Sequence, residues 1–242
     1  MELDINGTAS SNEADIAEEF NRFFSTIGEK ISNSIPNTNI DPLYCTDNKN
    51  VPLFTFDHIH GGEVLSNIRN LESKSSTDIF GFNTKLIKFV DTAICNPLAH
   101  IFTISLKDGI FPKLKCSRVV PVFKNGDRKK CNNYRPISLV SIFSKIIEKI
   151  VSYKLTNHLQ LYKLLTPNQF YLSTEHNLIH LTNFISDTLN DNKYVIGIFL
   201  DLQKAFDVVS HDILIKKTTQ TWDTGCCPVM VQKLSIGKIA VC

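Results

Sequence analysis

One apolar run constrains the fold of this chain more than any other feature of its sequence. Residues 194–200 read YVIGIFL, seven apolar or glycine residues with no polar residue among them. A run of this length without alternation predicts a β-strand that is buried on both faces, as in the middle of a sheet covered by helices. Such a strand needs neighbouring strands and covering helices, so the run indicates an α/β or α+β chain.

Helical periodicity is present on both sides of this run. Apolar residues recur at steps of three and four, which is typical of helices that bury one face. The pattern predicts a helix-rich chain with few strands. We expect helices over 14–35, 62–71, 96–108, 141–161 and 177–189, the third with Pro97 in its first turn, and a short capped helix after Ser210.

A second strand is expected in the centre of the chain. Residues 118–123 (RVVPVF) are mostly β-branched, and Lys124–Asp127 (KNGD) is a strong turn signal. Pro121 cannot donate a backbone hydrogen bond, so this strand is expected at a sheet edge or in an irregular form.

Charge is distributed unevenly along the chain. The net charge is only +2, yet residues 113–154 hold 11 Lys or Arg against 2 Asp or Glu. This concentration of positive charge indicates a polyanionic partner such as nucleic acid. From charge alone, a solvated basic face without any partner is an equal alternative.

Cysteine usage and hydropathy indicate an intracellular protein. The 7 cysteines are scattered and never form C-x-x-C, which favours reduced thiols over a disulfide framework. The acidic opening does not resemble a signal peptide. The longest uncharged stretch, 92–106, is too short to span a membrane, so we expect no membrane partner.

Asp201 stands directly after the apolar run, and Asp207 follows six residues later. A carboxylate at the end of a strand usually meets water, a cation or a basic side chain, because burying it alone is costly. Magnesium is bound by one or two carboxylates, whereas an Asp after a strand can also be a helix cap or a turn residue. Spacing alone leaves both roles open.

Several motifs, in the same order along the chain, resemble the reverse transcriptase of LINE-type (non-LTR) retrotransposons, in particular the jockey-like elements. NYRPISL (133–139) and FLDLQKAFD (199–207) are the most specific, and KSSTDIFGFNTKLIK (74–88) resembles the region before the polymerase core. The similarity runs from about residue 15 to 217. It implies a partial right-hand polymerase fold, with the fingers and the start of the palm.

The resemblance also divides the chain. It implies a helical N-terminal extension and linker over 1–56, and a helical region before the polymerase core over 57–112. A partial reverse transcriptase domain over 113–217 and a divergent tail over 218–242 would follow.

The resemblance assigns roles around the second motif. Asp201 matches a catalytic, metal-binding carboxylate of the polymerase, and the carbonyl of Leu202 would be its companion ligand for Mg²⁺. Phe206 matches the aromatic residue that excludes a 2′-hydroxyl from the nucleotide site, and Asp207 matches a structural residue. An ordinary core aromatic is the alternative role for Phe206.

Basic residues before and within the first motif receive roles in the same way. Lys124 and Arg135 match residues that face the incoming triphosphate, where a cation makes a charge-assisted contact with phosphate. Arg128, Lys129 and Lys130 would contact nucleic acid, and membership of a solvated basic face is the alternative for all five.

Parts of the family pattern are absent from this sequence. No Asp-Asp pair occurs in the 242 residues, so the Tyr-x-Asp-Asp hairpin is missing, as are the family's Pro-Gln-Gly turn and its thumb. The resemblance thus implies a truncated RNA-directed DNA polymerase that is inactive as this chain. The family uses a template–primer of RNA and DNA and deoxynucleoside triphosphates. The alternatives are a non-catalytic nucleic-acid-binding remnant that uses 113–154, or an unstable product without function.

Overall fold

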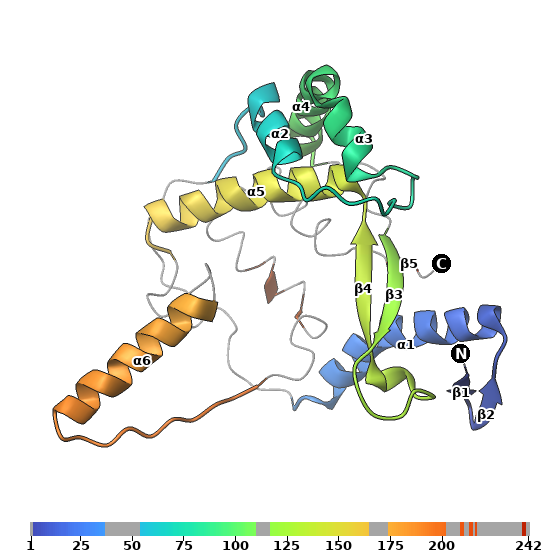
Figure 1. The fold of residues 1–242 in the computed structure, drawn as a ribbon, viewed down its shortest axis with the longest axis vertical. Helices are drawn as coiled ribbons and strands as arrows, with labels where there is room; N and C mark the ends of the chain where they lie inside the picture. The colour runs from blue at the N-terminus through green and yellow to red at the C-terminus, as the bar shows by residue number, and fades with distance from the viewer. Residues whose placement is uncertain are drawn as a thin grey trace.

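The computed structural model describes residues 2–36, 54–109, 117–164 and 174–201, together with 209–210, 213–214, 216 and the backbone of 239–240. Helices α2, α3 and α4 lie on one side of the long helix α5, and a β-hairpin leads from the start of α5 towards α1 (Figure 1). Helix α6 lies apart from these elements. The described fold is therefore mixed, with more helix than strand.

The N-terminus forms a small hairpin that the sequence analysis did not predict. Strands β1 (Leu3–Ile5) and β2 (Thr8–Ser10) pair antiparallel, and the two residues between them, Asn6 and Gly7, have φ of 53° and 86°. Asn-Gly is the preferred pair for such a turn, because both positions require positive φ. Helix α1 (Glu13–Ser34) follows, capped by the side chain of Asn12, close to its predicted bounds.

A second hairpin occupies the centre of the chain. Strands β3 (Ser117–Phe123) and β4 (Tyr134–Val140) pair antiparallel along their whole length, and a loop with the short helix η2 (Cys131–Asn133) joins them. The strand at 118–123 and the turn after it are thus confirmed. β4 was not predicted, because Pro136 interrupts the sequence pattern of a strand there. In the structure, Pro136 lies directly opposite Pro121. Strand β5 (Ile239–Ala240) runs parallel to the first two residues of β3, so β3 is the middle strand of its sheet and not the edge strand expected from Pro121.

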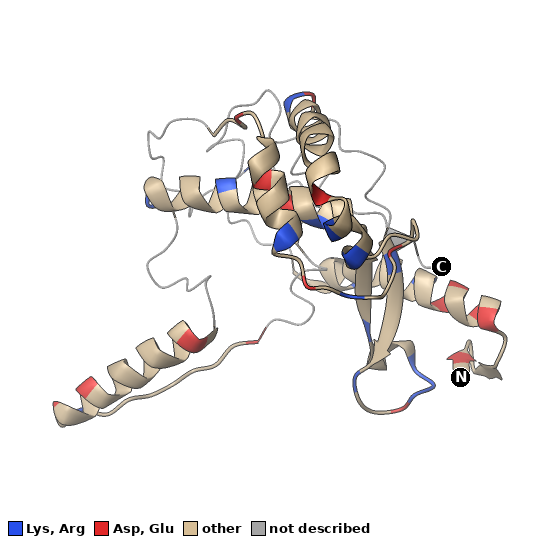
Figure 2. Ribbon diagram, turned by 45° about the horizontal axis from the view of Figure 1, so that its top comes forward, with Lys and Arg blue, Asp and Glu red and all other residues tan. Residues whose placement is uncertain are grey.

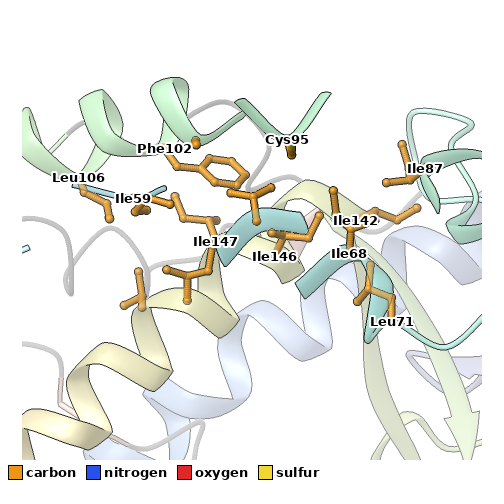
Figure 3. Packing of buried hydrophobic residues seen from close by; sticks show 14 residues of the cluster. Ile59, Ile68, Leu71, Ile87, Cys95, Phe102, Leu106, Ile142, Ile146 and Ile147 are labelled. Atoms are coloured by element: carbon orange, nitrogen blue, oxygen red, sulfur yellow. The ribbon is translucent and has the colours of Figure 1, made fainter. Parts of the chain in front are cut away.

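Four helices build the main hydrophobic core (Figure 3). Helices α2 (Gly61–Arg69) and α5 (Ile142–Leu161) agree with the predicted segments, and Ser141 caps α5 by accepting a hydrogen bond from the backbone N–H of Ser144 at 3.1 Å. Their apolar faces meet α4 (Asp91–Lys107), and the short helix α3 (Thr84–Phe89) contributes Ile87. The fully buried members include Ile68, Phe102 and Ile146.

The start of α4 differs from the prediction. A helix beginning at 96 with Pro97 in its first turn was expected, but α4 begins at Asp91 and Pro97 lies inside it. The reason is α3, which the sequence analysis missed: its C-cap, Val90, is also the N-cap of α4, so the second helix starts immediately. Cys95 and Ala99, on either side of Pro97, are buried in the core, and this packing keeps the helix continuous despite the missing N–H.

The prediction of a buried strand over 194–200 is wrong for the described structure. Helix α6 (Thr174–Asn190) is present but buries none of its residues, and the segment after it forms no strand. Tyr194 and Leu200 are 97% and 88% exposed. A central strand needs neighbours on both sides to pair its N–H and C=O groups, and no strand of the described residues lies beside this segment.

Two further expectations are tested only in part. The Ser210 hydroxyl accepts a hydrogen bond from the N–H of Ile213 at 3.4 Å, as a helix cap would, but most of the helix expected there lies outside the described residues. None of the helices that the structure describes is both long and apolar enough to cross a membrane.

Candidate nucleic-acid interface

The β3–β4 hairpin concentrates positive charge. Between 117 and 135 the chain has six Lys or Arg and one Asp. All six cationic residues are exposed, and most of them surround the loop at the free end of the hairpin (Figure 2). They are Arg118, Lys124, Arg128, Lys129, Lys130 and Arg135. The structure thus brings together the five basic residues selected from the sequence and adds Arg118.

Hydrogen bonds hold the loop in one conformation. The hydroxyl of Tyr134 donates to the carbonyl of Arg128 at 2.7 Å, and the side-chain amide of Asn133 donates to the carbonyl of Asp127 at 2.8 Å. The Asp127 carboxylate accepts from the N–H of Lys129 at 2.9 Å. These bonds use the loop's backbone, and its cationic side chains are exposed.

Aromatic rings join the loop to the N-terminal core. The guanidinium of Arg128 lies 4.6 Å from the centre of the Phe123 ring, a cation–π contact. Phe123 packs edge-on against Tyr134, which packs edge-on against the buried Phe20 of α1. The base of the basic loop is therefore anchored in the cluster that α1, β1 and the hairpin share.

Acidic residues of the N-terminal hairpin reach the same loop. Glu2 forms an ion pair with Lys129 at 3.0 Å, and the N–H of Asp4 donates to the carbonyl of Lys129 at 2.8 Å. The hydrogen bond and charge of Glu2 raise the pKa of Lys129 above its ordinary value, and Lys129 lowers the pKa of Glu2. Both side chains are more than half exposed, so the pair contributes little to stability.

One face of the hairpin is apolar between two arginines. Antiparallel partners share a face, so Arg118, Val120 and Val122 lie on the same side as their partners Leu139, Ile137 and Arg135. Val122 and Ile137 are 42% and 46% exposed, whereas Val119 on the opposite face is buried against the α1 cluster. Arg135 therefore points to the solvent side, near the loop end that holds Lys124.

Asp201 is not part of this arrangement. It is exposed at the end of the described segment that follows α6. Leu202, Phe206 and Asp207, which were expected beside it, lie outside the described residues.

The expected Mg²⁺ ligands are described only in part, because Asp201 lies among the described residues and Leu202 does not. No group of three or more His, Cys, Asp or Glu among them is placed to hold a metal ion. Mg²⁺ sheds its water reluctantly and gains little from one exposed carboxylate such as Asp201.

Cys131 places a thiol beneath the basic loop. Cys131 lies in η2 and is buried in the N-terminal core. Burial raises the pKa of its thiol to about 11, because the thiolate would lose its hydration. Cys131 therefore contributes packing under the basic loop.

Sequence reasoning missed the residues that position the loop. Tyr134 lies within the quoted motif NYRPISL, and a polar aromatic residue at a strand start was a usable signal for a buried ring with a bonded hydroxyl. Glu2 and Asp4 gave no such signal, because they lie more than a hundred residues away from Lys129 along the chain.

A region that begins at the last residue of β3 matches a known family. Residues 123–233 match the family described as Reverse transcriptase (RNA-dependent DNA polymerase). This stretch contains the basic loop, β4, α5 and α6, and it extends beyond residue 217, where the motif-by-motif resemblance ends.

Curated relatives from Drosophila melanogaster agree with the family. The probable RNA-directed DNA polymerase from transposon BS is 30% identical over 161 residues, which are 64% of this chain and 18% of the relative. The RNA-directed DNA polymerase from mobile element jockey is 29% identical over the same length and shares. The putative 115 kDa protein in type-1 retrotransposable element R1DM is 29% identical over 173 residues, 68% of this chain and 16% of the relative.

The extent of these matches is informative. A match over 64% of the chain is larger than residues 123–242 alone provide, so the similarity to these reverse transcriptase relatives includes residues before 123. The chain spans less than a fifth of the length of the relatives. The resemblance to non-LTR retrotransposon polymerases is confirmed.

Proposed function

We propose that this part of a reverse transcriptase binds the phosphate backbone of nucleic acid through the basic loop between β3 and β4. The observation that carries the proposal is the set of six exposed cationic residues on one hydrogen-bonded hairpin. Cations that neutralise phosphates release condensed counterions, so such a surface binds nucleic acid strongly at low salt. Phosphate contacts carry no base information, so the binding is independent of sequence.

The names of the relatives support a proposal for the ligand. Two of the relatives are named as RNA-directed DNA polymerases, and a template–primer of RNA and DNA is proposed as the ligand of this chain. Lys124 and Arg135, near the loop end of the hairpin, would hold the triphosphate of a deoxynucleotide by charge-assisted hydrogen bonds. Localisation in the cytoplasm or nucleus, where such ligands are found, belongs to the same proposal.

Binding without polymerisation is proposed for the 242-residue chain. Transfer of a nucleotidyl group by two metal ions requires several carboxylates around the pair of ions. Asp201 is one exposed carboxylate, and the sequence contains no Asp-Asp pair. The described residues thus support a nucleic-acid-binding remnant better than a complete catalytic centre.

Charge reversal on the loop tests the binding proposal. Lys129→Glu with Lys130→Glu is compared with Lys30→Glu and Lys85→Glu, a control of equal charge change on exposed residues elsewhere. Fluorescence anisotropy with a labelled single-stranded RNA and a labelled duplex measures affinity across a salt series. The loop variant should weaken binding and flatten the slope of log affinity against log salt by about two, since each lost phosphate contact lowers the slope by about one.

The control variant distinguishes binding by the β3–β4 loop from binding by the net charge of the whole chain. The Lys30 and Lys85 variant should keep the wild-type slope. Equal losses in both variants would indicate binding by net charge alone, and an unchanged slope in the loop variant would place the binding surface elsewhere.

A further inference from the structure

Two Asn-Gly pairs occur in this chain, and both lie in hairpin connections. Asn6-Gly7 joins β1 to β2, and Asn125-Gly126 lies in the basic loop that follows β3. All four residues are exposed, and both glycines have φ of 86°. Because glycine has no Cβ, its backbone nitrogen is open to close approach by the side chain of the preceding asparagine.

An asparagine in such a pair can lose its side-chain amide to an intramolecular displacement. The glycine nitrogen gives up its proton and attacks Cγ of the asparagine. The new C–N bond closes a succinimide ring, and the side-chain amide takes up a proton and leaves as ammonia. Water then opens the ring, at Cγ to give aspartate or at the backbone carbonyl to give isoaspartate. No oxidant or reductant takes part, and either product replaces a neutral amide by a carboxylate.

The two pairs differ in what holds the glycine nitrogen. The N–H of Gly7 donates to Oδ1 of Asp4 at 2.8 Å, and the pairing of Ile5 with Thr8 closes the turn. This nitrogen must give up a charge-assisted hydrogen bond, beside a carboxylate, before it can attack as an anion. Within the part of the chain that the structure describes, the N–H of Gly126 has no such acceptor.

The charge of the basic loop favours the reaction at Asn125. Lys124 and Arg128 lie on either side of the pair, against the single carboxylate of Asp127. The attack places negative charge on the glycine nitrogen and then on the Cγ oxygen, and nearby cations stabilise that charge. The carboxylate of Asp127 accepts a hydrogen bond from the N–H of Lys129, which offsets part of its repulsion.

The conformation of the loop requires glycine at position 126. Its φ is positive, and a Cβ there would lie 2.8 Å from Nδ2 of Asn133. The same Nδ2 donates to the carbonyl of Asp127, so it is not free to move away. The reactive pair is therefore part of the conformation that holds the cationic side chains in place.

We propose that Asn125 is a site of spontaneous deamidation to aspartate and isoaspartate, and that this modification weakens the binding of nucleic acid by the basic loop. The second half rests on the proposed function. A new carboxylate among the cations offsets one of their charges, so fewer counterions are released on binding phosphate. Isoaspartate also lengthens the backbone of the loop by one carbon.

Peptide mapping by mass spectrometry tests the chemistry on the full chain. The protein is incubated at neutral pH in water enriched in a heavy oxygen isotope, so each deamidated residue carries one labelled oxygen. The product should accumulate at Asn125 about tenfold faster than at Asn6, because a hydrogen bond to a charged acceptor is worth roughly the 1.4 kcal/mol that equals tenfold in rate. In urea, where both turns are unfolded, the two rates should become similar.

Variants at the protecting carboxylate and at the reactive residue provide controls. Asp4→Ala releases the N–H of Gly7 and should raise the rate at Asn6 without changing the rate at Asn125. Asn125→Gln keeps an amide, but its longer side chain has to close a larger ring, so it should not deamidate. A rate at Asn6 that equals or exceeds the rate at Asn125 in the folded chain would overturn the assignment of the site.

The effect on binding is measured separately, with the labelled RNA and the same salt series. Asn125→Asp should bind more weakly than Asn125→Gln and lower the slope of log affinity against log salt by up to about one. Equal affinities of the two variants would overturn the effect on binding but not the modification. A wild-type chain that binds no RNA would overturn the proposed function, whereas the mass-spectrometric result is independent of it.

Discussion

Tyr134 connects the buried core to the candidate interface through a single side chain. Its ring packs between Phe20 and Phe123, and its hydroxyl reaches the carbonyl of Arg128 in the basic loop. A phenol suits this position because one end of the side chain is apolar and the other end can donate a hydrogen bond. At the residue scale, the conformation of the basic loop therefore depends on this hydroxyl group together with the bonds of Asp127 and Asn133.

Replacing Tyr134 by Phe tests this dependence. The substitution keeps the ring and removes only the donor to the Arg128 carbonyl. We expect the free energy of unfolding, measured by urea denaturation, to fall by about 1 kcal/mol, the usual net value of one hydrogen bond. The control Tyr153→Phe, on a residue that is 68% exposed, should leave stability unchanged. Equal stability of both variants would show that the hydroxyl contributes nothing.

Asp78 links two elements that are far apart in the sequence. Its carboxylate accepts hydrogen bonds from the N–H groups of Phe80 and Phe82 at 2.9 and 3.0 Å, and from the N–H of Ile142 at 3.1 Å. Ile142 is the first residue of α5, where a negative charge meets the positive end of the helix dipole. At the element scale, this side chain fixes the loop before α3 onto the start of α5.

The loss of Asp78 should therefore affect the whole helical core. Asp78→Ala removes an acceptor shared by three N–H groups, and we expect the free energy of unfolding to fall by about 2 kcal/mol. Asp78→Asn keeps one acceptor oxygen and should recover part of that loss. Asp57→Ala, at an exposed position, is the matched control in thermal melts. A melt of Asp78→Ala that matches the control would contradict this link.

Three parts of the molecule differ in how well they are packed. Helices α2, α4 and α5 enclose one core, and α1, β1 and the β3–β4 hairpin enclose a second. Helix α6 and the residues up to Asp201 bury almost nothing. At the scale of the whole molecule, the basic surface therefore rests on a packed core, whereas the one carboxylate matched to catalysis does not.

This difference leads to a prediction about activity. We expect the 242-residue chain to show no primer extension on a poly(rA)–oligo(dT) template with Mg²⁺ and deoxythymidine triphosphate, because Asp201 alone cannot hold two metal ions together. The assay is run beside Asp201→Ala and beside an active reverse transcriptase. Extension by the wild type that disappears in Asp201→Ala would show that other carboxylates, from this chain or from a second copy, complete the site.

The amino-acid sequence by itself determined the features that depend on neighbouring residues. The apolar stripes of α1 and α5 and the turn after β3 are local patterns, and each was predicted close to its observed position. The basic residues of the interface were found by counting charges, and the family by motifs in order along the chain. These signals depend on no contact between distant segments.

Tertiary structure alone decided the rest. The early start of α4, the pairing of β4 through Pro136, and the bonds from Tyr134 and Glu2 to the basic loop depend on segments that meet only after folding. The run at 194–200 is the clearest case. Its composition indicates how much apolar surface it has to bury, but only a neighbouring strand can pair its backbone, and none of the described strands lies beside it.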